Sequence, residues 1–343
     1  MDKIDFVVTW VDGNDPIWLQ EKSLYTDEKV NYQLNDDNRY REMEAFKYWF
    51  RAVETYAPWV NKIFFVTYGH LPVWLDTNNP KLEIVKHEDY IPKDYLPTYN
   101  STVIELNLHR IKNLSEKFVL FSDDVFLNST VTPTDFFKNN LPRLLGVYRP
   151  IIPQKDFNVT ELNNVRLINH YFYDKKCIKK NISKFFTPKY GKFNLYNFFS
   201  LFCSGIMGYE DTHVGLPHLK SSFKEIWELE PELLNRTCLH RFREIGDINH
   251  WVMSYYNIER NNFYPQSLKI GKYVPIADDK QIKQALRNSK YKMICINDDE
   301  SSVDFSGESR IIDEELSKKF PRRSKFERSW YAEKNINCSC SIL

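Results

Sequence analysis

The first 125 residues alternate between short apolar runs and segments with a helical pattern, and this alternation limits the folds open to the chain. Apolar runs typical of buried strands occupy residues 4–11, 62–67, 82–85 and 118–121. Helices are expected over residues 41–57, and from Ser101 or Thr102 to about residue 113. Strands that alternate with helices favour a mostly parallel sheet with helices on both faces. We therefore predict an α/β, Rossmann-like fold.

The alternation is lost after about residue 150, which divides the chain into three parts. We expect a Rossmann-like half over 1–150, a variable insertion over 151–215, and a helical region with a closing strand and a basic tail over 216–343. Within the insertion, residues 171–199 mix seven lysines with many aromatic side chains. This basic and aromatic elaboration could lie on a membrane surface, line a sugar groove, or be an irregular insertion with a partly buried aromatic face.

Charge and hydropathy limit the classes of partner that we expect for this chain. The formal net charge is only +1, which gives no support for nucleic-acid binding. No apolar run approaches the length that crosses a bilayer, and the first residues lack the pattern of a secretory signal. We expect a cytoplasmic protein, and we leave open a homodimer and a peripheral contact with the inner face of the plasma membrane.

Three acidic, turn-like clusters follow apolar strands: Asp12 to Asp15, Asp123-Asp124, and Asn297-Asp298. In open α/β sheets, ligands bind beyond the carboxyl ends of the strands. Carboxylates placed there can hold Mg²⁺ or Mn²⁺, which commonly carry phosphate oxygens. If the strands are parallel neighbours, all three clusters face one crevice. The structural alternative is a set of solvated turns in which Asp caps a helix.

A cationic cluster lies later in the chain, where His240-Arg241-Phe242-Arg243 brings one imidazole and two guanidinium groups together. Arginine forks match phosphate oxygens, and a histidine can act as general base near neutral pH. The alternative is a helix end where positive charge complements the dipole. Arg39 and Arg41 could likewise be ordinary solvated residues, and His109-Arg110 could serve packing or a ligand.

Four ordered blocks carry a resemblance to a known family. The first is residues 4–16, IDFVVTWVDGNDP, and the second runs from residues 39–44, RYREME, through Leu96-Pro97-Thr98 and His109-Arg110 to Asp123-Asp124. The third spans residues 216–243 and the fourth residues 294–298. These blocks resemble the Stealth proteins, which are sugar-1-phosphate transferases. The resemblance implies a GT-A-like sheet and transfer of hexose-1-phosphate, or N-acetylhexosamine-1-phosphate, from a UDP-sugar donor. The acceptor would be a hydroxyl of a glycan or lipid-linked oligosaccharide in capsule or surface polysaccharide synthesis, with UMP released.

The resemblance also assigns roles to residues. Asp123, Asp124 and Asp298 would hold Mg²⁺ (or Mn²⁺), and either His240 or Asp124 would be the general base, with Arg243 clamping phosphate. Substrate binding would fall to Trp10, Asp12, Gly13, Asp15, Arg39, Glu42, Ser101, Glu105, His109, Arg110, His218 and Asn297. Two other hypotheses stay open: a metal-dependent glycosyltransferase that releases UDP, and a non-catalytic glycan-binding or scaffold protein.

Overall fold

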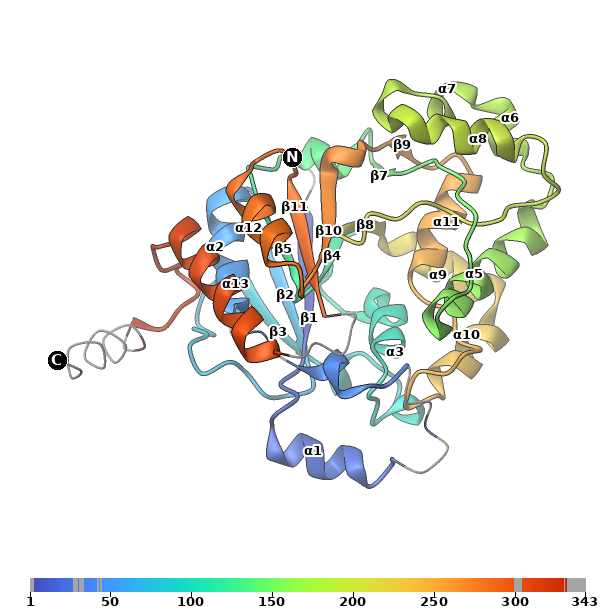
Figure 1. The fold of residues 1–343 in the computed structure, drawn as a ribbon. Coiled ribbons are helices and arrows are strands. Elements are labelled where there is room, and N and C mark those ends of the chain that lie inside the picture. The colour runs from blue at the N-terminus through green and yellow to red at the C-terminus, as the bar shows by residue number, and fades with distance from the viewer. Residues whose placement is uncertain are drawn as a thin grey trace.

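The computed structural model of the chain describes residues 3–26, 30, 34–41, 43, 45–298, 304–329 and 331. Its centre is a five-stranded sheet in the order β3-β2-β1-β4-β8 (Figure 1). Four strands are parallel: β1 (Ile4–Trp10), β2 (Ile63–Thr67), β3 (Leu82–Lys86) and β4 (Lys117–Ser122). The edge strand β8 (Leu216–Leu219) is antiparallel to β4. The predicted Rossmann-like, mostly parallel sheet is confirmed.

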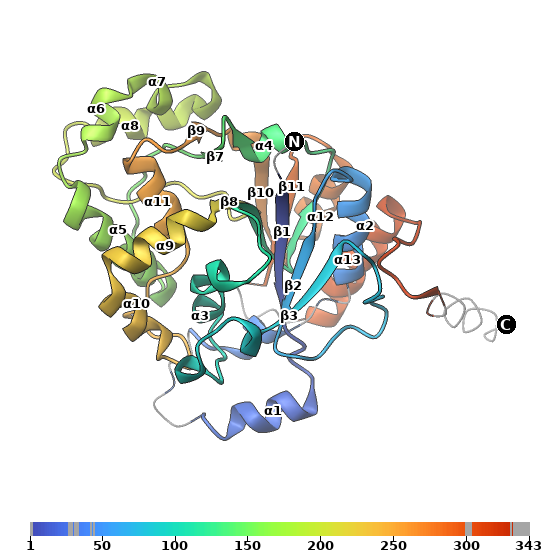
Figure 2. The same cartoon turned by 180° about the vertical axis from the view of Figure 1, so that it is seen from behind.

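Both faces of this sheet are covered, because successive side chains of each strand point to opposite sides. Phe6 and Val8 of β1 belong to one hydrophobic core, while Val7 between them belongs to the other. The first core is completed by α2 (Phe46–Tyr56), α12 (Asp279–Arg287) and α13 (Phe305–Lys319). The second is completed by α3 (Ser101–Leu106), α5 (Asp156–Phe172), α9 (Lys220–Leu229), α10 (Pro231–Cys238) and α11 (Trp251–Glu259) (Figure 2).

The closing strand lies elsewhere than the sequence suggested. It is β11 (Met293–Asn297), which pairs with β10 (Gly271–Pro275) and β5 (Val125–Leu127) in a second, three-stranded sheet. The acidic segments therefore do not end three neighbouring strands. Two of them still meet, because the backbone N–H of Ile296 donates to the carbonyl of Asp124 at 2.9 Å.

The elaboration is helical, as predicted. Beyond α5 it contains α6 (Lys176–Lys180), α7 (Ile182–Phe185) and α8 (Asn194–Ser200), which form a lobe away from the central sheet (Figure 1). A small sheet of β6 (Phe137–Lys138), β7 (Leu141–Leu144) and β9 (Tyr264–Pro265) lies beneath the lobe. The remaining helices are α1 (Pro16–Ser23) and α4 (Pro133–Phe136). No helix in the described part of the chain is both long and apolar enough to cross a membrane.

Some expected boundaries shift. The helix after Asn100 ends at Leu106 and is followed by a separate 3-10 turn at Leu108–Arg110. The cap is Asn100, whose side chain accepts a hydrogen bond from the N–H of Thr102. His218 lies on a strand rather than a helix, because pairing with β4 overrides the local pattern.

Candidate active site

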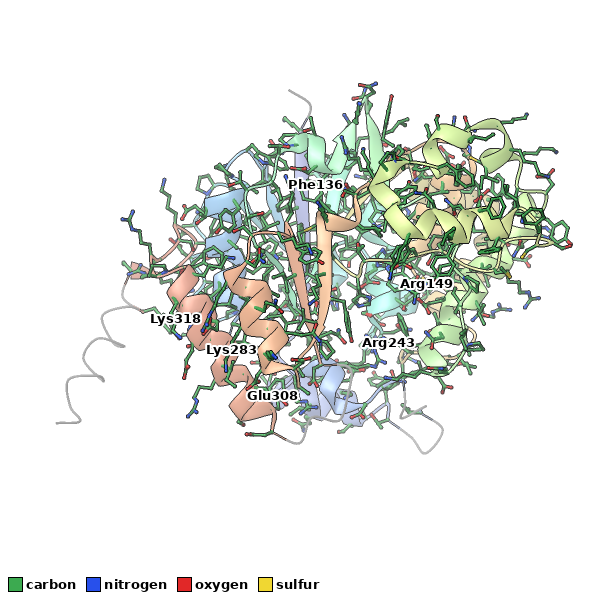
Figure 3. The ribbon with its side chains drawn as sticks, turned by 45° about the horizontal axis from the view of Figure 1, so that its top comes forward. Phe136, Arg149, Arg243, Lys283, Glu308 and Lys318 are labelled. Carbon is green, nitrogen blue, oxygen red and sulfur yellow. The ribbon has the colours of Figure 1, made fainter. Side chains whose placement is uncertain are left out.

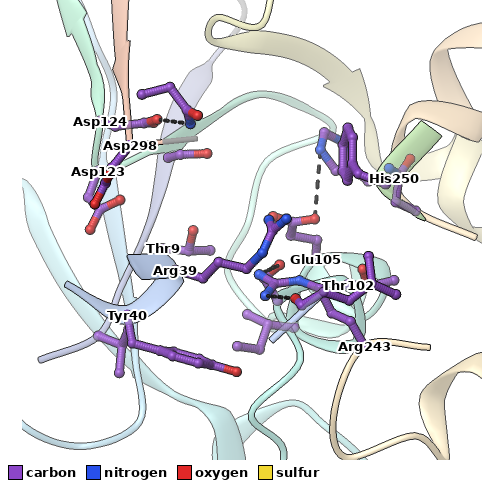
Figure 4. Close-up of a pocket in the computed structure, with 18 of the residues that line it drawn as sticks. Thr9, Arg39, Tyr40, Thr102, Glu105, Asp123, Asp124, Arg243, His250 and Asp298 are labelled. Carbon is purple, nitrogen blue, oxygen red and sulfur yellow. Dashed lines mark hydrogen bonds and ion pairs between the residues drawn. The ribbon is translucent and has the colours of Figure 1, made fainter. Parts of the chain in front are cut away.

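A cleft of about 680 Å³ opens beyond the carboxyl ends of β1 and β4. Its walls come from segments that are far apart in the sequence: the end of β1, the 3-10 turn η1 (Asp37–Tyr40), α3, the loop before α11 and the end of β11. Figure 4 shows carboxylates on one wall and Glu105, His250 and Arg243 on the other, with Arg39 between them. This is the edge at which open α/β sheets bind ligands.

The acidic wall is built around Asp124, in the tight turn between β4 and β5. Its Oδ2 accepts hydrogen bonds from Asn297 Nδ2 at 2.9 Å and from the Cys295 thiol at 3.3 Å. Its Oδ1 is buried, and no described residue forms a hydrogen bond with it. A buried carboxylate oxygen without a partner is costly, so this atom is suited to a ligand that supplies positive charge.

Asp123 and Asp298 lie beside it (Figure 4). The Oδ2 of Asp298 is 3.2 Å from Nη2 of Arg41, whose guanidinium also lies 4.7 Å from the ring centre of Phe305. Among the described residues, no group of three or more His, Cys, Asp or Glu is placed to hold a metal ion. Mg²⁺, however, is commonly bound by one or two carboxylates together with substrate phosphates. Asp124 with Asp123 or Asp298 fits that pattern.

Two arginines face the acidic wall. Arg243 donates to Ser101 Oγ at 2.7 Å and to the carbonyl of Leu34 at 3.3 Å, so its guanidinium is fixed in place. Burial and the nearby charge of Arg243 lower the pKa of Arg39 to about 10. Two cations held this close favour an anion between them, and guanidinium groups suit phosphate oxygens.

A chain of titratable groups lies next to Arg243. Oε2 of Glu105 is 3.7 Å from Nε2 of His250, and Nδ1 of His250 is 3.0 Å from Nε2 of His218. Burial raises the pKa of Glu105 to about 7, although Arg243 opposes the shift. Burial also lowers the pKa of His250 to about 3 and holds that of His218 well below its usual range. The two imidazoles are therefore neutral near pH 7, whereas Glu105 titrates there and can accept a proton.

His240 has the partner of a general base. Its Nδ1 is 2.6 Å from Oδ1 of Asp247, and this hydrogen bond raises the pKa of His240 despite partial burial. The other oxygen of Asp247 accepts from Asn100 Nδ2 and from the N–H of Glu244. Asp247 and Glu244 line the cleft, whereas His240 does not. The role of His240 as general base stays a prediction.

The structure brings nine of the predicted residues to the cleft: Trp10, Arg39, Ser101, Glu105, Asp123, Asp124, Arg243, Asn297 and Asp298. Seven others do not line it: Asp12, Gly13, Asp15, His109, Arg110, His218 and His240. Glu42 lies outside the described residues.

The turn at the end of β1 follows the structural alternative. Asp12 Oδ1 accepts from the N–H of Asn14, and Asp15 Oδ1 caps α1 through the N–H of Trp18. Farther away, Arg110 stacks on the ring of Trp227 at 4.8 Å. These carboxylates and this guanidinium already have partners within the protein.

Sequence reasoning missed His250 and Asp247. A signal was available, since Asp247-Ile248-Asn249-His250 places three polar side chains immediately before an apolar helical segment. It also missed the aromatic part of the cleft. There the ring centroid of Trp18 lies 5.2 Å from that of Tyr40 and 5.6 Å from that of Tyr99. No local pattern marks those three residues as neighbours, because they come from distant segments.

Comparisons with known proteins show the family of the chain. Models of Stealth conserved regions 1 and 2 match residues 2–30 and 39–144. The capsular polysaccharide phosphotransferase WcwK of Streptococcus pneumoniae is 58% identical over 96% of this chain and 100% of its own length. The exopolysaccharide phosphotransferase cps2G of Lactiplantibacillus plantarum is 39% identical over 95% of this chain and 96% of its own. Among solved structures, the galactosyltransferase LgtC is 11% identical, covers 94% of this chain and 98% of its own, and has a TM-score of 0.38, a likeness too distant to carry an argument.

The similarity to these relatives extends over nearly the whole chain, which identifies the protein as an enzyme of the phosphotransferase class. More particularly, the chain belongs to the Stealth family.

Proposed function

We propose that this enzyme transfers sugar-1-phosphate from a UDP-sugar to a hydroxyl of a glycan or lipid-linked oligosaccharide, for a capsule or another surface polysaccharide. The single observation that carries the proposal is the arrangement of the cleft, in which Arg39 and Arg243 face Asp124, whose buried Oδ1 bonds to none of the described residues. Such a site suits a diphosphate, because phosphoryl transfer depends mainly on positioning and charge stabilisation. The similarity to capsular and exopolysaccharide phosphotransferases supports the same reaction class.

In the proposed step, the acceptor oxygen attacks the phosphorus that carries the sugar. The new O–P bond forms while the bond from that phosphorus to the bridging oxygen breaks, and UMP leaves with the bridging oxygen. The acceptor proton moves to a base. We propose Glu105 for this role, because it lines the cleft, burial raises its pKa to about 7, and its Oε2 lies 3.7 Å from Nε2 of neutral His250. His240 is the competing candidate, supported by its bond to Asp247.

The remaining groups bind and orient the donor. Arg243 and Arg39 would hold the phosphate that is transferred, and Ser101 keeps the Arg243 fork in position. Trp10 would lie at the nucleotide end, at the close of β1. Asp124 with Asp123 or Asp298 would hold Mg²⁺, which when bound supplies positive charge to the diphosphate.

The nucleotide product tests the proposal. The protein is incubated with a panel of UDP-sugars, Mg²⁺ and candidate glycan acceptors, and the released nucleotide is identified by chromatography. We expect UMP, together with a phosphodiester in the glycan. Release of UDP would overturn the proposal in favour of a metal-dependent glycosyltransferase, which attacks the anomeric carbon. Absence of turnover, unchanged in Asp124→Ala and His240→Ala variants, would favour the scaffold hypothesis.

A further inference from the structure

The helical lobe carries an apolar surface that does not serve the cleft. We define the lobe as residues 171–203, which contain α6, α7 and α8. The side chains of Phe202, Phe199 and Leu195 are 76%, 61% and 59% exposed. The rings of Phe199 and Phe202 each lie against Phe198, at 5.6 and 5.4 Å between centroids. These exposed side chains, with Leu201, form one apolar patch.

The helix α8 buries polar side chains and exposes apolar ones, which is the reverse of the usual arrangement. Its buried side chains are Asn197 and Ser200, both polar. Asn197 donates to the carbonyl of Gly146 at 2.7 Å and accepts from the N–H of Tyr148 at 2.7 Å, so its polar atoms are satisfied inside. The apolar residues are spaced at three, four and seven positions on the outer side, at 195, 198, 199 and 202. In a soluble protein the apolar stripe normally faces the core, so this one faces a partner.

The patch is fixed to the body of the protein. Lys175 Nζ donates to the carbonyls of Ser200 and Cys203, which joins the start of α6 to the end of α8. Lys184 Nζ donates to the carbonyl of Phe263 at 2.7 Å. Phe185 is fully buried below. These hydrogen bonds and the packing of Phe185 therefore hold the apolar side chains of the patch outward.

The charge around the patch indicates the partner. The lobe contains seven lysines and one acidic residue, Asp174, in a chain whose total charge is only +1. Two lysines point inward as described, and five are exposed: Lys176, Lys179, Lys180, Lys189 and Lys192. Exposed Lys176 forms an ion pair with Asp174 at 2.6 Å, so the excess positive charge on the surface of the lobe comes from the other four exposed lysines. Aromatic residues flanked by lysines match an interface with apolar chains below and anionic headgroups above.

We propose that the lobe docks the enzyme on the surface of an anionic lipid bilayer, with the outer side chains of α8 inserted at the boundary between headgroups and acyl chains. The surrounding lysines contact the phosphates of the headgroups. The contact is peripheral. It does not depend on the reaction proposed for the cleft.

Flotation with vesicles tests this inference. The full chain is mixed with vesicles of phosphatidylcholine alone, or of phosphatidylcholine with phosphatidylglycerol, and the fraction that floats is measured. We expect flotation with the anionic vesicles, reduced by added salt, and little with the neutral ones. Phe199→Ser/Phe202→Ser and, separately, Lys180→Glu/Lys192→Glu should each reduce the ratio of bound to free protein by on the order of tenfold.

Matched controls lie far from the lobe. Ile17→Ser/Leu24→Ser removes one side chain of α1 and that of the residue directly after it, which are 75% and 76% exposed, and α1 lies at the opposite end of the molecule (Figures 1 and 2). Lys280→Glu/Lys283→Glu reverses charge on α12, where Lys280 is exposed and Lys283 is partly exposed, and α12 lies on the side of the molecule away from the lobe (Figures 1 and 3). Both controls should float like the unaltered protein.

Failure of the unaltered chain to float with the anionic vesicles would overturn the inference. Flotation of both patch variants to the same extent as the unaltered chain would also overturn it. A third such result concerns the oligomeric state of the free protein, measured by sedimentation. A dimer that Phe199→Ser/Phe202→Ser dissociates would make the patch a contact between copies of this chain. The lysine variant keeps the test decisive if the phenylalanine variant fails to fold.

Discussion

At the scale of single residues, the role of a carboxylate in this chain depends on what already binds it. Asp12 and Asp15 use a side-chain oxygen to organise their own turn, whereas Asp124 keeps Oδ1 buried and without a partner in the part of the chain that the structure describes. Sequence patterns treat these residues alike, since all follow an apolar strand. Only tertiary contacts distinguish them. The sequence therefore predicted where the acidic wall lies but assigned too many carboxylates to it.

Asp124→Asn should separate activity from stability. The change keeps the size of the side chain but removes the negative charge, so we expect turnover to fall roughly 100-fold or more. We expect no loss of thermal stability, because the amide no longer buries an unpaired charge. Asp12→Asn is the control, with turnover within about threefold of normal. An Asp124→Asn enzyme that loses activity only because it unfolds at assay temperature would contradict the assignment.

The pH profile should distinguish the two candidate bases. Because burial raises the pKa of Glu105 to about 7, kcat/KM should rise with pH as Glu105 loses its proton and level off above about 7. Glu105→Gln should remove this acidic limb and lower kcat roughly 10²- to 10⁴-fold. His240→Asn should retain the acidic limb of the kcat/KM profile. If instead His240→Asn abolishes the limb and Glu105→Gln retains it, the base is His240.

At the scale of elements, the sequence located the strands well because each is a compact apolar run bounded by turn residues. It placed β1, β2, β3 and β4 within a residue or two. It expected the closing strand, which is β11, but not its pairing with β5, and it placed β8 in a helical region, because no local pattern encodes the pairing of β8 with β4. His218 was therefore predicted to belong to a helical region, and His250 was missed.

The turn after β1 depends on a close approach between elements. A Cβ added to Gly13 would lie 1.9 Å from the carbonyl oxygen of Tyr40, in the same 3-10 turn as Arg39. Gly13→Ala should therefore displace that turn, lower kcat/KM about tenfold and cost about 1–3 kcal/mol of stability. Gly246→Ala is the matched control, since its Cβ would meet nothing within 4 Å. Steady-state kinetics and thermal unfolding of both variants check this, and equal effects would refute it.

The start of the sheet depends on Asp5, which is fully buried. Its carboxylate accepts from Asn61 Nδ2 at 2.6 Å and from the N–H groups of Lys62 and Ser115 at 3.2 and 2.8 Å. Asp5→Ala leaves these donors without their partner, so chemical denaturation should show a loss of about 2–4 kcal/mol. Asp76→Ala, in an exposed turn, should cost below about 1 kcal/mol. A similar loss in both variants would contradict this account.

At the scale of the whole molecule, the cleft is assembled from both ends of the chain. The end of β11 supplies Asn297 and Asp298 to the cleft that begins at the end of β1, and α13 supplies Phe305. Arg51 of α2 forms an ion pair with Glu327 near the C-terminal end. The sequence could predict the fold class, because alternation of strands and helices is a regular signal. It could not predict which distant loops would meet, since that depends on packing across both cores.

The central claim is that the bond broken lies between the two phosphorus atoms of the donor. A UDP-sugar labelled with ³²P at the phosphorus that carries the sugar, incubated with enzyme and acceptor, tests this directly. The account predicts that the label moves into the glycan product and that the released UMP is unlabelled. Label leaving with the nucleotide, as UDP, would contradict it.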